Sequence, residues 1–371
     1  MELVVHKNDL LRELQFYQGI VERKNTIPIL ANVLMEAGAD HVRFLATDLE
    51  VALRSRCPAS VSRPGTVTVP AKKLFEIVKA LPDTDVRIRE EKNGVKVAAD
   101  RFDSRIQTLP LEDFPTVPDA TGKDSVLLPG AQLREMAEKI QFAMTSEDTR
   151  YYLNGALFVL QGGSISLVAT DGHRLAHVSM TKPAEAAGEG AEESRAILPK
   201  KTVWELSRLL AEHDGEIRYE RSENHLFFTV GDRVLISRMI EGQFPAFERV
   251  IPKGNDKRVE FERERITNAV RRVALLSNER SRAIKFEIER DKVEVTSNST
   301  EIGEAREVLT VDYAGAPLQI CFNAQYVQDF LNVVKTDAVA MELKDEVSQA
   351  VMRPVGSLDY EYTYVLMPMR I

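Results

Sequence analysis

A chain of 371 residues with 44% hydrophobic and 29% charged residues is long enough for two or three domains of about 100–200 residues, and its composition is that of a folded protein. Two cysteines are too few for a disulfide framework, the first residues lack a secretory signal, and no apolar run approaches the roughly 20 residues of a membrane span. We therefore expect a cytoplasmic protein without a metal or other cofactor. The formal net charge of −8 argues against a tight, patch-type nucleic-acid binder, but leaves the placement of the basic residues open.

Each third of the chain opens with a short predicted strand followed by an amphipathic helix. Residues 8–20 have the helical period, with Asn8 or Asp9 as the cap, and the same period recurs at 130–144 and 263–276. The apolar stripe of the first helix consists of Leu10, Leu11, Leu14 and Tyr17.

Alternating strands follow each first helix, and a second helix comes after them. These second helices are predicted within 69–81, 198–210 and 322–334, and Pro-Ala-Lys-Lys or Pro-Lys-Lys opens the first two of them. Further alternating strands are predicted at 216–221, 226–232 and 233–240. Each third is thus α+β, with two helices packed on an antiparallel sheet.

The chain repeats itself three times. The stretches 44–53 and 167–176 align without a gap, with Thr47 matching Thr170 and Asp48 matching Asp171. A third copy at 293–302 places Ser297 and Asn298 at these positions, and the second helices and the closing stretches 109–117, 239–250 and 366–371 recur in the same order. Polar linkers at 118–125 and 251–258 give three domains, 1–120, 126–252 and 254–371.

The stretch ATDGHRLA (169–176) contains the residue types of a small catalytic site. Asp171 and His173 form an acid/base pair in one interpretation, and His173 with His177 has the spacing of a zinc pair on a helix. The alternating residues before it predict a strand, however, and residues four apart on an extended chain lie about 13 Å apart. The matching stretch of the first repeat has no histidine. We therefore interpret Thr170-Asp171 as a hydrogen-bonded turn and keep a hydrolase as the weaker hypothesis.

Two other stretches indicate binding. Arg150 followed by Tyr151 and Tyr152 is the combination that contacts nucleic acid, although one tyrosine inside and one outside a strand explains it equally well. The last residues, 364–371, are apolar and rich in methionine, whereas chain ends are normally polar. They predict a tail that docks on the protein and binds partner peptides, with a plain closing strand as the alternative.

The basic residues are concentrated on the predicted helices. These helical segments carry a net charge of +7, so the rest of the chain carries −15. A solvated face explains each helix separately, but the three-fold repetition favours one helix-lined surface that faces something anionic. The segments counted are 7–24, 72–79, 134–139, 200–208, 262–272 and 326–335.

These motifs closely resemble the DNA polymerase III beta subunit family, the bacterial sliding clamps, over essentially the whole chain. The resemblance implies the DNA clamp fold, a head-to-tail homodimer whose six domains form a ring, with helices around the hole and sheets outside. It implies a non-catalytic processivity factor that encircles double-stranded DNA without reading its sequence. Weak, diffuse phosphate attraction suits sliding, because each fixed phosphate contact adds affinity. The matching motifs are RYYLNG (150–155), ATDGHRLA (169–176), GQFPAFERVIP (242–252), SNE (277–279) and MPMRI (367–371).

The resemblance also implies roles for individual residues. DNA contacts map to Lys24, Arg150, Tyr151 and Tyr152, and Glu147 replaces a glutamine of the family, which weakens DNA contact there. The partner-peptide pocket maps to Leu153, Thr170, Gly172, His173, Arg174, Leu175, Pro245, Arg249, Val250, Val347, Met367, Pro368, Met369 and Arg370. The dimer interface maps to Lys73, Leu275, Leu276, Glu301 and Glu304.

The partners implied are the polymerase III alpha subunit, the clamp loader, other proteins with a clamp-binding motif, and a second copy of the chain. No membrane partner is expected. A protein-binding scaffold without a role on DNA is a third hypothesis. Salt-insensitive behaviour and failure to encircle a duplex would favour it.

Overall fold

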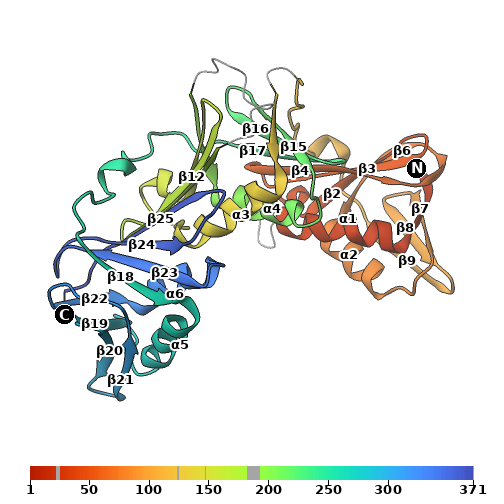
Figure 1. Cartoon of the computed structure of the whole chain (residues 1–371). Helices are drawn as coiled ribbons and strands as arrows, with labels where there is room; N and C mark the ends of the chain where they lie inside the picture. Colours follow the sequence, from red (N-terminus) through yellow and green to blue (C-terminus); the bar gives the residue numbers. More distant parts are fainter. Residues whose placement is uncertain (22–25, 123–124, 147, 182–192, 371) are drawn as a thin grey trace. The chain divides into compact units, whose positions relative to one another are not determined.

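The computed structural model describes residues 1–21, 26–122, 125–146, 148–181 and 193–370 (Figure 1). The chain divides into two compact units whose division does not follow the three sequence repeats. The first unit contains Met1–Arg134 with Lys201–Met239, and the second contains Glu135–Lys200 with Ile240–Ile371. The middle repeat therefore supplies strands to both units.

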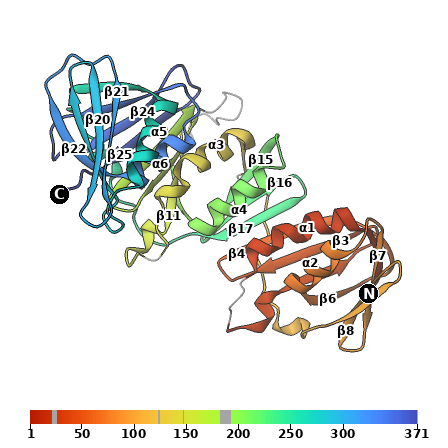
Figure 2. The same ribbon diagram turned by 90° about the horizontal axis from the view of Figure 1, so that it is seen from below.

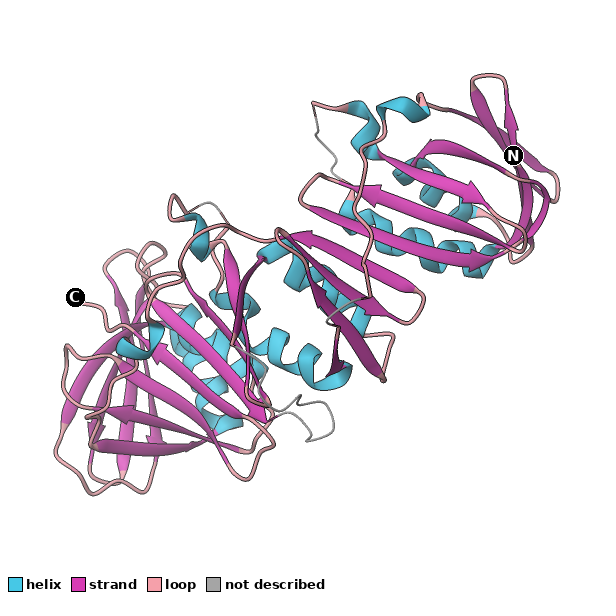
Figure 3. Cartoon of the chain, turned by 90° about the horizontal axis from the view of Figure 1, so that it is seen from above, coloured by secondary structure: helices cyan, strands magenta, loops and turns pink. Residues whose placement is uncertain are grey.

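In the first unit, helices α1 (Lys7–Ile20), α2 (Ala71–Ala80) and nearly all of α4 (Lys200–Leu210) lie in one layer over the sheet strands (Figure 2). The view from the opposite side has the strands in front of these helices (Figure 3). The strands of this unit are β1 (Glu2–His6), β2 (Asn32–Ala37), β3 (His41–Thr47), β4 (Val51–Pro58), β5 (Ser60–Arg63), β6 (Gly65–Pro70), β7 (Asp85–Glu91), β8 (Gly94–Ala99), β9 (Phe102–Gln107), β10 (Val126–Pro129), β15 (Glu216–Arg221), β16 (His225–Val230) and β17 (Arg233–Arg238). They form a five-stranded sheet, β5-β1-β7-β8-β9, and an eight-stranded sheet, β10-β15-β16-β17-β4-β3-β2-β6.

The second unit has helices α5 (Arg263–Ala274) and α6 (Ala324–Val333), while α3 (Gly130–Ile140) runs across the division between the units. Its strands are β11 (Gly155–Gln161), β12 (Ser164–Thr170), β13 (Arg174–Thr181), β14 (Ser194–Pro199), β18 (Lys257–Glu262), β19 (Ala283–Glu289), β20 (Lys292–Ser299), β21 (Gly303–Thr310), β22 (Leu318–Asn323), β23 (Ala338–Leu343), β24 (Ala350–Val355) and β25 (Glu361–Leu366). They form an eight-stranded sheet, β14-β11-β12-β13-β25-β24-β23-β18, and a four-stranded sheet, β21-β20-β19-β22.

Each repeat begins with the same strand-to-helix step. The first residues of α1, α3 and α5 donate their backbone N–H to a carbonyl just before a later strand of the same repeat: Lys7 to Thr84, Gly130 to Gly215 and Arg263 to Asp337. Helices α1, α3 and α5 lie where the first helices of the three repeats are predicted. Helices α3 and α5 end at Ile140 and Ala274, before their predicted ends. A 3₁₀ turn, η3 (Gln141–Ala143), follows α3.

Helical periodicity accounts for the cores. Leu10, Leu14 and Tyr17 on α1 are fully buried, as are Ile266 and Val270 on α5. Leu11 is only half-buried, so it borders the stripe. The alternating strands bury one face in the same way, which gives each repeat two helices against antiparallel strands and confirms the predicted α+β class.

Strand pairing joins consecutive repeats. The last strand of the second repeat, β17, pairs with β4 of the first, with Ile236 opposite Ala52. The last strand of the third repeat, β25, pairs with β13 of the second, with Val365 opposite Leu175. Each eight-stranded sheet is therefore built from two repeats.

No helix in the described part of the chain is both long and apolar enough to cross a bilayer. The third copy of the Thr-Asp motif differs from the other two, because β20 continues through Ser297 and Asn298 to Ser299. Ser297 Oγ donates instead to the Val273 carbonyl, at the end of α5.

Candidate functional site

The TDGH stretch forms the turn between β12 and β13. Thr170 Oγ1 accepts the Gly172 N–H at 3.1 Å, and Asp171 Oδ1 accepts the N–H groups of His173 and Arg174 at 2.9 and 3.0 Å. Gly172 has a φ of 87°, a left-handed conformation that glycine adopts without steric cost. The predicted hydrogen-bonded turn is confirmed.

The first repeat builds the same turn from its own Thr-Asp pair. Thr47 Oγ1 accepts the Leu49 N–H at 2.9 Å, and Asp48 Oδ1 accepts the N–H groups of Glu50 and Val51 at 2.9 and 2.7 Å. Leu49 stands where the second repeat has Gly172 and has a φ of 81°. The motif is therefore an architectural element that the chain uses twice.

The hydrolase hypothesis is wrong. The Asp171 carboxylate holds the turn and also accepts the Arg174 Nε–H at 3.0 Å. The His173 ring stacks on Tyr326, whereas the His177 ring meets the edge of Phe247. The two histidines face different neighbours, and neither is paired with Asp171 through its ring.

Arg174, which the resemblance assigns to the partner-peptide pocket, is largely buried in the chain. Its side chain is only 9% exposed, and the guanidinium donates to Asp171, to Asp329 on α6 and to the Phe142 carbonyl. It also lies between the rings of Phe142 and Tyr326, with its central carbon 5.1 and 4.3 Å from their centroids. Arg174 is therefore a buried bridge between the turn and α6.

The electrostatics of Arg174 follow from these contacts. Burial by itself lowers the pKa of the guanidinium, but the Asp329 and Asp171 carboxylates outweigh this and leave the pKa above its ordinary value. Burial raises the pKa of Tyr364, so its hydroxyl stays protonated. The bridge is a fixed cation at every pH at which the protein is folded.

An apolar cluster lies beside the turn and contains Leu175. The cluster consists of Leu157, Val159, Val168, Leu175, Ile197, Phe247 and Val365, with Tyr152, Ile240, Phe244 and Ile251 packed against it. Tyr152 therefore belongs to this cluster. Most residues of this cluster lie on β-strands, where the sequence pattern does not show which face of the sheet is covered by the core. Of the seven buried cluster residues, the sequence therefore predicted only Leu175 as part of the site.

Exposed apolar side chains come from the same unit. Val250, Val347 and Met367 are 39%, 56% and 38% exposed, although each is apolar. Val250 follows η6 (Phe247–Arg249), whose Phe247 is a member of the cluster. Leu153, in contrast, is buried.

The carboxy-terminal tail is held in place by backbone hydrogen bonds. Met367 donates its N–H to the His173 carbonyl at 3.0 Å, and Met369 donates to the Cys321 carbonyl at 2.8 Å. The tail thus docks on the TDGH turn and on β22, as predicted from its apolar composition. Pro368 and Met369 are half-buried, while Pro245, Arg249 and Arg370 are exposed.

The RYY loop is organised by an ion pair. Arg150 donates from Nε and Nη2 to the Asp148 carboxylate at 2.9 and 2.7 Å, and this pairing lowers the pKa of Asp148 to about 2. Tyr151 is 74% exposed, whereas Tyr152 packs on the apolar cluster. Within this loop Tyr151 is the side chain most open to a ligand. Lys24 and Glu147, also predicted near DNA, lie outside the described residues.

The helical cations are less free than the charge count predicts. Lys139 is 1% exposed, paired with Glu135 and placed 4.2 Å from the Tyr360 ring centroid. The prediction that this lysine belongs to a solvated basic surface is wrong. Lys201 pairs with the buried Asp48 carboxylate. Internal pairing therefore leaves the helical surface only moderately basic.

Four of the five residues assigned to a dimer interface are exposed. Leu275, directly after α5, is 75% exposed, and the Lys73 side chain is 68% exposed while paired with Glu76. Glu301 and Glu304 are exposed, and Leu276 is half-buried. Ile302 and Val308, which the sequence reasoning missed, are 48% and 50% exposed apolar residues in the same part of the third repeat.

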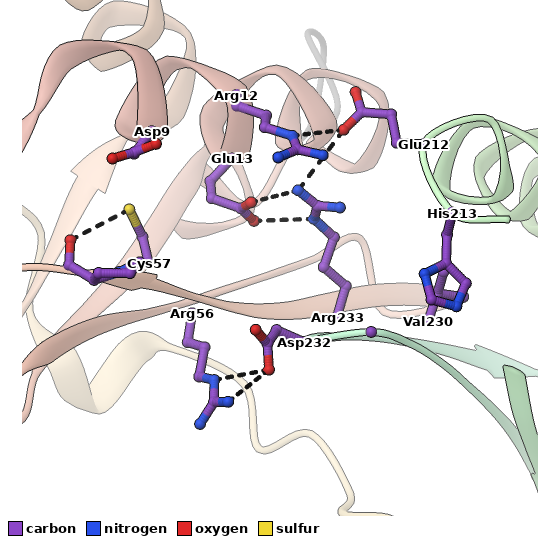
Figure 4. Close-up of a pocket in the computed structure, with 12 residues that line it drawn as sticks. Asp9, Arg12, Glu13, Arg56, Cys57, Glu212, His213, Val230, Asp232 and Arg233 are labelled. Atoms are coloured by element: carbon purple, nitrogen blue, oxygen red, sulfur yellow. Dashed lines mark hydrogen bonds and ion pairs between the residues drawn. The ribbon is translucent and has the colours of Figure 1, made fainter. Parts of the chain in front are cut away.

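A polar cavity of ≈ 280 Å³ opens between the first and second repeats in the first unit (Figure 4). Its charged groups neutralise one another: Arg233 pairs with Glu13, Arg12 with Glu212, and Arg56 with Asp232. Burial raises the pKa of the Cys57 thiol in its wall to about 12, so the nucleophilic thiolate is scarce. The cavity has the residue types of an active site, but six of its charged side chains are paired with one another.

Comparison with known proteins identifies similarity over the whole chain. Models of the N-terminal, central and C-terminal domains of the DNA polymerase III beta subunit match residues 1–118, 127–246 and 248–370. The chain is 38% identical over 375 residues to the beta sliding clamp of Pseudomonas putida and 36% identical over 373 residues to that of Escherichia coli, covering 100% of both chains in each case. A crystal structure of a sliding clamp from Pseudomonas aeruginosa bound to griselimycin is 38% identical, with a TM-score of 0.93 and 100% of both chains covered.

Proposed function

The chain belongs to the DNA polymerase III beta subunit family, the beta sliding clamps, and we propose that it encircles duplex DNA as a homodimeric ring and tethers the replicative polymerase to it. The family is one of processivity factors and has no catalytic activity. We also propose that the protein works in the cytoplasm, where the clamp loader and other proteins with a clamp-binding motif use the same surface.

The pattern of sheet edges is the observation that favours a closed ring. In both eight-stranded sheets, the last strand of one repeat pairs with the strand after the Thr-Asp turn of the preceding repeat. The last strand of the first repeat, β9, is an edge strand, and so is β21, the third repeat's counterpart of β4 and β13. We propose that β9 of one copy pairs with β21 of another, which repeats the junction already used twice within the chain.

Such a contact joins two different surfaces and is therefore head-to-tail. Each copy has one β9 and one β21, so a closed ring leaves neither edge strand unpaired. The exposed apolar residues Phe102 on β9 and Leu275, Ile302 and Val308 in the third repeat support this contact, because they are 42%, 75%, 48% and 50% exposed in the single chain. We infer the number of copies in the ring, two, from the resemblance to the family.

For DNA we propose Lys24, Arg150, Tyr151 and Tyr152 as contacts, with two refinements from the geometry. Tyr151 is the more exposed of the two tyrosines, and Arg150 reaches phosphate only by sharing its charge with Asp148. Shared charges bind phosphate weakly, which suits a protein that must slide.

For partner proteins we propose that a peptide binds over the apolar cluster, between the TDGH turn, the exposed Val250 and Val347, and the tail. The griselimycin-bound clamp shows that a member of the family binds a ligand. We propose the same pocket residues as the resemblance implies. Arg174 contributes by holding the TDGH turn through its contacts with Asp171 and Asp329. We expect Leu175→Asp, or deletion of 367–371, to abolish peptide binding while the dimer remains.

Retention on DNA tests the central proposal. After loading, the protein should stay on a nicked circular duplex and be lost when the circle is linearised, because only the circle prevents escape from an enclosing ring. Equal loss from both substrates would refute enclosure. The double variant Leu275→Asp, Val308→Asp should be monomeric by mass and fail to be retained, whereas Leu111→Asp, at an exposed apolar position outside the proposed contact, should remain dimeric. A wild-type monomer would contradict the β9–β21 contact.

A further inference from the structure

His177 is a titratable side chain on the apolar sheet face, and none of the proposed contacts uses it. It lies two residues after Leu175 on β13, and alternate residues of a strand point to the same face of a sheet. Across the sheet it stands opposite Val168 on β12 and Thr363 on β25, and Val168 is a member of the apolar cluster. His177 therefore borders the cluster over which we place the partner peptide.

An aromatic ring of the second repeat covers His177. The imidazole and the Phe247 ring of η6 meet in a T-shaped arrangement, with their centroids 5.1 Å apart. Phe247 is itself a member of the cluster, and the exposed Val250, which the resemblance assigns to the pocket, directly follows η6. Phe247 thus connects His177 to the surface on which a partner is proposed to bind.

Charged groups on three elements act on His177. Glu248 on η6 and Glu361 on β25 favour a proton on the ring, whereas Arg353 on β24, which donates to Thr363 Oγ1, disfavours one. Both carboxylates are exposed, so water and salt screen them. Burial has the largest effect and holds the pKa of His177 below its ordinary value.

The first repeat has a different solution at the same position. Arg54 on β4 corresponds to His177, and it pairs with Asp119. Asp119 corresponds to Arg249 of the second repeat, because the Phe-Pro dipeptides that start five residues earlier align. The carboxylate that balances a cation in the first repeat is thus replaced by a cation in the second, which favours a neutral side chain at His177.

We propose that His177 is a further residue of the partner pocket and that a bound ligand excludes the proton from its ring, so that partner binding weakens as pH falls. This inference rests on the proposed function, because it assumes that partners bind over the apolar cluster. A ligand that covers Phe247 and Val250 removes water from beside the imidazole, and loss of water disfavours the charged form. Ligand and proton therefore compete without sharing an atom.

The competition acts on the acid side of neutrality. Above pH ~6.5 the free pocket holds the neutral ring, because the pKa of His177 lies below this ordinary value, and the ligand binds with full affinity. As pH falls through the pKa of the free protein, the ring gains a proton that must leave when the ligand binds. Each binding event then releases up to one proton, and affinity falls by at most about tenfold per pH unit.

Griselimycin, the ligand bound by a sliding clamp from Pseudomonas aeruginosa, is the probe. Calorimetric titration of the full-length protein should give a dissociation constant that is steady between about pH 7 and 8 and rises roughly three- to tenfold by about pH 5.5. Titrations in buffers of different ionisation enthalpy should show proton release at the lower pH and little at the higher. A constant affinity over this range, without proton release, would overturn the proposal.

Variants assign the proton to one ring. His177→Phe and His177→Gln are neutral at every pH, so neither should lose affinity in acid or release a proton on binding. His225→Phe is the matched control and should follow the wild type, because His225 also lies near an aromatic ring, 6.5 Å from Phe227 between centroids, but belongs to the first unit. A pH dependence that persists in both His177 variants would contradict the assignment.

His173 is the other histidine of the second unit and the alternative source of a pH effect. It is exposed on the TDGH turn, with its ring stacked on Tyr326. His173→Gln should keep the fall in affinity with acid, whatever its affinity at neutral pH. If the fall disappears in this variant, the proton belongs to His173 and the proposal is wrong.

The pocket and the proton are tested separately. If the wild type does not bind griselimycin at neutral pH, or Leu175→Asp binds it equally well, the proposed pocket fails and the role of His177 fails with it. If the wild type binds, Leu175→Asp does not, and affinity is independent of pH, only the role of His177 is wrong. Circular dichroism at each pH confirms that every variant remains folded.

Discussion

The two junctions between repeats have the same strand topology and different side-chain chemistry. At the junction of the first and second repeats, β17 pairs with β4, and at that of the second and third, β25 pairs with β13. The first junction is held by ion pairs: the exposed pairs Arg12–Glu212 and Arg56–Asp232, whose side chains are 39–62% exposed, and the buried pair Arg233–Glu13, whose side chains are 11% and 9% exposed. The second is held by a buried cation and stacked aromatic rings.

The buried junction gains its order from aromatic contacts. The Phe142 ring of the second repeat meets the Tyr364 ring of the third edge-to-face, with centroids 5.6 Å apart, and the His173 ring stacks on Tyr326. Tyr362 donates its hydroxyl to the Lys139 carbonyl and Tyr364 donates to the Tyr326 carbonyl. Fully buried donors with partners are rigid and insensitive to salt, whereas exposed ion pairs are screened.

The two junctions also differ beside their Thr-Asp turns. The first repeat has Ala52 at the position of Leu175, and only a cavity of ≈ 70 Å³ lies between its turn and the Pro115–Pro118 connection. A small cluster of Ala52, Phe227 and Ile236 fills the place of the larger apolar cluster. Backbone pairing is thus the part that the repeats share, and side-chain chemistry is the part that diverged.

The largest effect should come from breaking the buried bridge. Arg174→Ala leaves the Asp171 and Asp329 carboxylates without their cation and should lower the free energy of unfolding of the second unit by about 3–5 kcal/mol. Urea unfolding, with hydrogen exchange of β13 and β25 as the local probe, measures this. A loss below about 1 kcal/mol would mean that the bridge is not what holds the turn to α6.

Acidification should weaken the second junction through His177. Burial lowers the pKa of this histidine below its ordinary value, so the unfolded chain binds the proton first as pH falls. The stabilisation is complete above pH ~6.5, the unfolded value, and is lost as pH falls from there toward the folded pKa. Urea midpoints between about pH 5 and 8 should decline in the wild type and less in His177→Phe. An unchanged slope in the variant would assign the decline to other groups.

Salt should distinguish the two junctions without a mutation. Raising ionic strength from about 0.05 to 0.5 M screens exposed pairs, so exchange of amides in β4 and β17 should accelerate relative to those in β13 and β25. Equal acceleration in both pairs of strands would show that the ionic junction is no more dependent on charge than the aromatic one.

The smallest effect should come from one exposed pair of the first junction. The Arg12 and Glu212 side chains are 57% and 39% exposed, so Arg12→Ala should change the free energy of unfolding by less than about 1 kcal/mol. This variant is the matched control for Arg174→Ala. A comparable loss in both would contradict the distinction between the junctions.

Much of the architecture was predictable because it depends on local patterns. The period of Leu10, Leu14 and Tyr17 predicts α1, and the Thr-Asp pair predicts its turn, because a threonine hydroxyl and an aspartate carboxylate bond the next N–H groups whatever surrounds them. The apolar tail correctly predicts docking, since its exposure would be unfavourable.

The candidate site was predictable only in part. Arginine is a residue type that commonly contacts ligands. Arg174 is instead enclosed by Asp329 and Phe142, which are far from it in the sequence and reach it only through tertiary packing. Lys139 was counted as a solvated charge for the same reason. Composition does not reveal which cations find internal partners.

The sequence by itself determined three copies of one α+β plan, the turns that mark them and the family to which they belong. Hydrogen bonds between near neighbours and the helical period explain this, because both act within a few residues. The tertiary structure alone decided that strand pairing crosses the repeats, that Arg174 is enclosed and that His177 lies against Phe247. These outcomes depend on contacts between residues far apart in the chain, and no local pattern encodes them.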